Sequence, residues 1–145
     1  MRKKSEAQRY LEQIEKLETL IENKLIEKNR WMEIAMGITA NMEGERVQSS
    51  GTKNKMGDAV SKCVDIESEI DRYIDELVEK KKSVTQTIEK LESINEYKVL
   101  HMRYIQFIEL AEIADYFGKE YSWATTTHGR ALKSVQRILD EAVNI

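Results

Sequence analysis

A seven-residue repeat of apolar side chains is the feature that most restricts how this chain can fold. The repeat runs through the middle of the 145-residue sequence and consists of Met56, Cys63, Ile70, Leu77, Val84 and Leu91. Such a row returns to one side of an α-helix at every second turn and packs against another helix as in a coiled coil. We therefore predict a long helix over about residues 58–92, with Val60, Ile74 and Ile88 filling the same face.

A second long helix is predicted before it. Between residues 5 and 36, apolar residues recur at steps of mostly three and four, and acidic residues occupy the other side. The sequence contains no proline that would interrupt either helix. Because a single amphipathic helix cannot bury its apolar stripe, residues 1–92 are expected to form an antiparallel helical hairpin. The alternative is that each stripe pairs with a second chain, in a homodimer.

The stretch between these helices, residues 37–57, has the composition of a loop. It holds four of the six glycines and little apolar content. Its basic residues, Arg46, Lys53 and Lys55, have no acid between them. They belong either to a mobile connector or to a secondary contact loop for phosphate or for a partner protein.

The remaining residues, 93–145, form a third helical unit with a sharp corner at Gly118. Asn95 is the expected N-cap of its first helix. A short apolar-periodic segment ends at Phe117, and a longer one runs from about Tyr121 to Val143. The expected inward residues of that last helix are Ala124, Thr127 or His128, Ala131, Leu132, Val135 and Ile138. Two helices joined by a short glycine-containing turn form a helix-turn-helix, whose second helix enters the major groove of DNA. The predicted fold is therefore all-α, a coiled-coil-like hairpin followed by a helix-turn-helix.

Local charge suggests which helix contacts DNA. The whole chain has a formal net charge of −3, whereas Lys119 to Arg137 contains four bases and one acid. The predicted DNA-binding residues on the last helix are Tyr121, Ser122, Trp123, Thr125, Thr126, His128, Arg130, Lys133 and Arg137. Arg130, Lys133 and Arg137 are expected to hold phosphates, while Ser122, Trp123, Thr125 and Thr126 face bases. An exposed Trp123 could equally dock on a protein.

No catalytic, metal or cofactor site is predicted. The single cysteine, Cys63, lies on the seven-residue row and is expected to be a core residue. With only His101 and His128 besides it, no zinc-binding spacing exists. The acids lie beside lysines at helical spacing, which is typical of surface pairs. We expect no enzyme activity and no small-molecule substrate. Because no apolar run approaches about 20 residues and no signal peptide is visible, we expect no membrane partner and a cytoplasmic location.

Several short motifs resemble known bacterial proteins. Leu100, Arg103, Tyr104, LAEIAD (110–115), Gly118 and RAL (130–132) resemble region 4 of bacterial sigma-70 factors. VQSSG (47–51) and HGRAL (128–132) are similar to an uncharacterised family of short phage and prophage proteins of Gram-positive bacteria. This resemblance implies a sigma region 4-like helix-turn-helix and a phage-type transcriptional regulator that binds promoter or operator double-stranded DNA in the bacterial host cell. It also implies RNA polymerase as a partner. The basic residues usual early in the second helix are replaced here by KEYSWATTT.

Two other functions are compatible with the sequence. A small terminase-like DNA-packaging component also joins a helix-turn-helix to helices that assemble subunits. A protein-binding adaptor would contact RNA polymerase through the same shape without DNA affinity of its own. The weakly basic last helix and Trp123 favour the adaptor somewhat.

Overall fold

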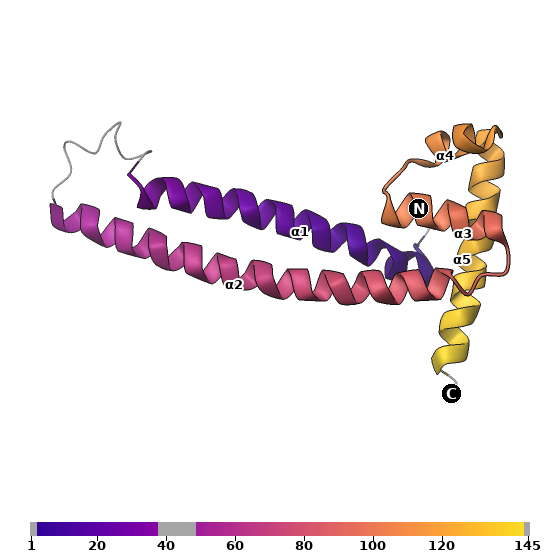
Figure 1. Ribbon diagram of the computed structural model, residues 1–145, viewed down its shortest axis with the longest axis horizontal. Coiled ribbons are helices and arrows are strands. Elements are labelled where there is room, and N and C mark those ends of the chain that lie inside the picture. Colours follow the sequence, from indigo (N-terminus) through magenta and orange to yellow (C-terminus); the bar gives the residue numbers. More distant parts are fainter. Residues whose placement is uncertain (1–2, 38–48, 144–145) are drawn as a thin grey trace. The chain divides into compact units, whose positions relative to one another are not determined.

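The computed structural model describes residues 3–37 and 49–143, with side chains from residue 55 onward in the second range, and these residues form helices and no strand. The elements are α1 (Glu6–Ala35), α2 (Ser49–Ile88), α3 (Ile94–Leu100), the π-helical turn η3 (His101–Ile105), α4 (Leu110–Phe117) and α5 (Tyr121–Val143) (Figure 1). The prediction of an all-α protein is confirmed. None of the helices described is long and apolar enough to cross a lipid bilayer.

The second long helix begins earlier than its composition suggests. α2 starts at Ser49 and ends at Ile88, so the prediction of a loop over residues 37–57 is wrong for residues 49–57. Serine and glycine each lower helix stability by only a modest amount, and a long helix remains stable when it contains a few of them. Of the predicted contact loop, Arg46 lies outside the described residues, whereas Lys53 and the exposed Lys55 lie on α2.

The chain divides into two compact units. Unit 1 comprises Met1–Lys16 and Leu77–Ile145, and unit 2 comprises Leu17–Glu76. The division passes through α1 and α2, so it does not coincide with the boundary between residues 92 and 93 that the sequence suggested. The beginning of α1 and the end of α2 belong to the same unit as the three C-terminal helices.

A hydrophobic cluster explains the composition of unit 1. Its buried members are Ala7, Leu11, Ile14, Val84, Ile88, Leu100, Tyr104, Ala131 and Val135. These residues come from α1, α2, α3, η3 and α5, and therefore pack all five elements together. Polar contacts add to the cluster, since the Tyr10 hydroxyl hydrogen-bonds Ser83 and lies 3.1 Å from the Thr87 hydroxyl. The Ala7 backbone N–H also donates to the Gln136 side-chain oxygen at 3.0 Å.

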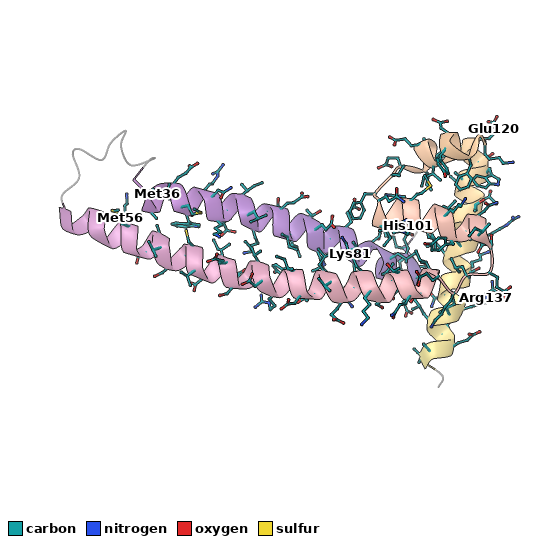
Figure 2. All side chains as sticks on the ribbon, viewed as in Figure 1. Met36, Met56, Lys81, His101, Glu120 and Arg137 are labelled. Atoms are coloured by element: carbon teal, nitrogen blue, oxygen red, sulfur yellow. The ribbon has the colours of Figure 1, made fainter. Side chains whose placement is uncertain are left out.

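Unit 2 consists of the remaining parts of α1 and α2. Two ion pairs define how they align, Lys24 Nζ to Glu69 at 2.8 Å and Lys28 Nζ to Glu67 at 3.1 Å. The later residue on α1, Lys28, pairs with the earlier residue on α2, Glu67, so the two segments run in opposite directions. Figure 2 shows Met36 and Met56 at the same end of the unit.

The apolar seam of unit 2 differs from the predicted one in its second row. Ile70, from the seven-residue row, is buried as predicted. The second row is formed by Ala59 and Ile66, at 0% and 3% exposure, whereas Val60 and Ile74 are 52% and 42% exposed. A seven-residue repeat allows a second row either three or four residues after the first. Here the second row that faces α1 lies three residues after the first. The prediction that Val60 and Ile74 share the buried face is therefore wrong.

The cap of α3 also differs from the prediction. Ser93 has extended backbone angles (φ −82°, ψ 120°), and its hydroxyl accepts a hydrogen bond from the Glu96 N–H at 3.2 Å. Asn95 lies inside the helix, so its assignment as the N-cap is wrong. α3 then continues into η3, which places Tyr104 in the core.

Candidate nucleic-acid interface

The corner between α4 and α5 is formed by Gly118. Its φ of 65° and ψ of 35° lie in the left-handed region, which glycine adopts without steric cost. The Gly118 N–H donates to the Asp115 carbonyl at 3.0 Å, and the Lys119 N–H donates to the Ala114 carbonyl at 2.9 Å. These bonds satisfy the last carbonyls of α4, and α5 begins at Tyr121. The predicted helix end at Gly118 is confirmed.

Small side chains let α4 and α5 approach closely. Ala114 is 2% exposed and Ala124 is fully buried. Further along α5, Thr127, Ala131 and Val135 are also buried, whereas His128 is half-buried. The predicted inward face is confirmed for these residues, with Thr127 rather than His128 buried at that level, whereas Leu132 and Ile138 are half-buried.

His128 is held by a contact inside unit 1. Its Nε2 lies 2.6 Å from the Tyr104 hydroxyl, and the two rings stack with centroids 5.6 Å apart. Burial lowers the pKa of His128, and the nearby Arg103 guanidinium lowers it further, while Glu12 acts in the opposite direction. Burial also raises the pKa of Tyr104. Tyr104 therefore occupies the Nε2 of His128, one of the predicted DNA-binding residues.

Trp123 likewise contacts a residue of unit 1, the ring of Phe117 at the end of α4. Its ring centroid lies 4.9 Å from that of Phe117, at an interplanar angle of 51°. Phe117 in turn packs edge-on against Tyr116. Thr125 is half-buried, and its hydroxyl donates to the Ser122 carbonyl at 3.0 Å. Trp123 therefore helps to hold the start of α5 against α4, whereas Thr125 contacts its own helix.

The other predicted contact residues are exposed. Tyr121 lies at the first position of α5 with 57% of its surface exposed. The rest are Ser122, Thr126, Arg130, Lys133 and Arg137, all exposed and separated by steps of three or four. Residues with this spacing share one side of a helix. We call these five residues the α5 stripe; it extends roughly 22 Å at 1.5 Å per residue.

The bases on the α5 stripe differ in their partners. Within the described part of the chain, no carboxylate lies within 4.0 Å of the Arg130 guanidinium or the Lys133 ammonium. The Arg137 Nη2, by contrast, donates to the Ser134 hydroxyl at 3.2 Å, which itself donates to a Glu96 carboxylate oxygen at 3.0 Å. Arg130 and Lys133 are therefore the two bases of the stripe without a side-chain partner among the described residues, although Arg137 likewise has no carboxylate within 4.0 Å. Figure 2 labels Arg137 on α5 and Glu120 just before the helix.

The sequence prediction omitted one basic residue of this region. Lys119 is exposed and lies in the turn, two residues before α5 begins. The N-terminal end of a helix presents free backbone N–H groups and the positive end of the helix dipole. The position of Lys119 just before the predicted start of the last helix is the signal that could have added it to the predicted DNA-binding residues.

The two acidic residues of α4 are not accompanied by a metal site among the described residues. Glu112 and Asp115 are exposed on α4, which carries no base, whereas the first five turns of α5 carry bases and no acid. Across residues 3–37 and 49–143, no three His, Cys, Asp or Glu side chains are grouped so that they could hold a metal ion.

Comparison with known proteins identifies one family. Its sequence pattern matches residues 38–140, which include all of α2, α3, η3 and α4 and most of α5. No curated protein and no solved structure shows a significant match to the chain. The chain belongs to the family described as "Protein of unknown function (DUF1492)".

Proposed function

We propose that this protein is a phage-type transcriptional regulator in which α4 and α5 form a sigma region 4-like helix-turn-helix. The observation that carries the proposal is the α5 stripe, which places two unpaired bases and two small hydroxyl side chains on one exposed side of the helix after the corner. This arrangement suits a helix lying in the major groove with its first turns near base edges.

The stripe divides into two parts by chemistry. Arg130 and Lys133 bind phosphates, because they are exposed and have no acidic partner. Ser122 and Thr126 lie closer to the start of α5 and face base edges, where hydroxyls hydrogen-bond and a threonine methyl suits thymine. Trp123 and His128 act indirectly, since their contacts with Phe117 and Tyr104 fix the orientation of α5.

The protein should bind only weakly to DNA that lacks its specific site. Its formal net charge is −3, and sequence-independent affinity arises mainly from neutralised phosphates. A regulator with few phosphate contacts depends more on base contacts or on a second partner. RNA polymerase is the partner that the resemblance to sigma region 4 suggests, with the paired segments of α1 and α2 as the contact or dimerisation surface.

A selection experiment tests the proposal. The purified protein is incubated at low salt with sheared bacterial and phage DNA, and bound fragments are recovered and sequenced. Enrichment of a promoter-proximal site supports the proposal, and Arg130→Ala should recover less of every fragment, because a phosphate contact carries no sequence information. Lys62→Ala is the matched control, because Lys62 is an exposed base on α2 that is not part of the stripe. Recovery of no fragment by the unaltered protein contradicts direct DNA binding.

An adaptor that binds another protein is the second candidate function, and unit 2 provides the observation that favours it. Its buried hydrophobic side chains are Leu17, Ala59, Ile66 and Ile70, whereas its exposed ones include Leu25, Ile26, Met32, Met36, Met56, Val60, Val64 and Ile74. Exposed apolar side chains in such number are typical of a contact surface. Recovery of RNA polymerase with the protein after nuclease treatment, together with no DNA shift at low salt, would establish the adaptor.

A further inference from the structure

Gly129 is a residue whose identity the fold does not explain. It lies well inside α5, which runs from Tyr121 to Val143. Glycine is the least favourable residue in a helix interior apart from proline, because it loses the most backbone freedom on folding. Gly57 inside α2 shows that a long helix tolerates a glycine, so only a requirement at this particular position would give Gly129 a role.

Neither backbone conformation nor internal packing supplies that requirement. Gly37 and Gly118 have positive φ among the described glycines, whereas Gly129 has a helical φ. A Cβ atom built on Gly129 would meet no neighbouring atom within 4 Å. The space beside its backbone is open, and alanine would fit there without displacing any part of the described chain.

The position of Gly129 shows what lies next to that space. Thr126 is three residues before it and Lys133 four residues after it, so all three share one side of α5. Arg130 follows directly, and all three of these neighbours are exposed. The missing side chain thus leaves a gap beside the α5 stripe, next to a hydroxyl and the two bases of the stripe that have no side-chain partner among the described residues.

From this placement we infer that Gly129 is where the sugar–phosphate backbone of DNA passes closest to α5. Glycine is the usual residue where a protein backbone approaches a ligand closely. Arg130 and Lys133 beside the gap would hold the phosphates of the same strand. A side chain at position 129 would move that strand away from both bases, so Gly129 is a positioning residue. The inference rests on the proposed DNA-binding function and adds to it a contact that depends on the absence of a side chain.

A size series at this position gives a sharp test. Gly129→Ala should raise the Tm by about 2–4 °C, because alanine favours the helix and has room. The same change should weaken DNA binding about 10-fold, since adding a methyl group to a close contact is costly. Gly129→Leu should weaken it further while the protein remains folded. The loss should be similar on selected and unrelated DNA, because a backbone contact carries no sequence information.

Gly57→Ala is the matched control. Gly57 also lies in a helix and is exposed, and a Cβ atom added to it would likewise meet no atom within 4 Å. Its substitution should leave DNA affinity unchanged. Unaltered affinity in Gly129→Ala, or a fall in its Tm, would overturn the inference while leaving the proposed function intact. Failure of the unaltered protein to bind any DNA would instead overturn the proposed function, and this inference with it.

Discussion

Truncation of one leucine near the N-terminus should destabilise the region that carries the candidate DNA-binding surface. Leu11 is fully buried in the cluster that joins α1 and α2 to α3, η3 and α5. Removing three carbons from such a site costs the lost burial plus the cavity left behind. We therefore expect Leu11→Ala to reduce the free energy of unfolding by about 3–5 kcal/mol. That loss is a large part of the roughly 5–15 kcal/mol that stabilises an ordinary domain.

Tryptophan fluorescence during urea unfolding can follow unit 1 alone. Trp123 belongs to unit 1 and Trp31 to unit 2, so the experiment uses a Trp31→Phe background. Leu25→Ala is the matched control, because Leu25 lies on the same helix at 44% exposure and outside the cluster. It should cost less than about 1 kcal/mol. An unchanged Trp123 transition in Leu11→Ala would refute the view that the first residues of α1 fold with the C-terminal helices.

Three further results are expected from the local structure. Gly118→Ala should cost about 1–2 kcal/mol in thermal unfolding, because φ is 65° there and a Cβ atom is strained in that region. Ser93→Ala should cost about 1 kcal/mol through loss of the α3 cap, whereas Asn95→Ala should cost much less; equal effects would refute the assignment of the cap. Burial lowers the pKa of His128, so the unfolded chain takes up its proton first as pH falls. Stability should therefore be complete above the usual histidine pKa of about 6.5 and should decline as pH falls from there towards the folded pKa. Urea midpoints at several pH values should show this decline, and His128→Gln should remove its contribution.

The sequence predicted the positions of the helices better than it predicted which sides of the helices pack together. Apolar spacing identified the long helices and the inward face of α5, because burial on one side of a helix imposes a period that can be counted. The same spacing did not distinguish Val60 from Ala59, since both positions continue a seven-residue repeat. Valine buries more apolar surface than alanine, but the direction towards α1 decides which of the two is buried. That direction depends on contacts far apart in the sequence.

Two other differences have local causes. The sequence does not predict the start of α2 at Ser49, because glycine and serine are typical of loops, although a long helix tolerates them. The sequence offers His128 both as an inward and as a DNA-contacting residue and Trp123 only as an exposed one, because an amphipathic pattern does not show which neighbours will cover a side chain. In this structure Phe117 covers Trp123, and Tyr104 covers His128. The exposed bases of the stripe were predicted directly, because charged residues without partners remain on the surface.

The central claim, that α5 binds DNA through Arg130 and Lys133, is tested most directly by the salt dependence of binding. Fluorescence anisotropy with a labelled duplex, measured at several salt concentrations, gives the slope of log K against log salt. Arg130→Ala should reduce the magnitude of this slope by about 0.9, the amount expected for one phosphate contact. Lys62→Ala should leave the slope unchanged. Absence of binding at low salt, or a slope that does not respond to Arg130→Ala, would contradict the account.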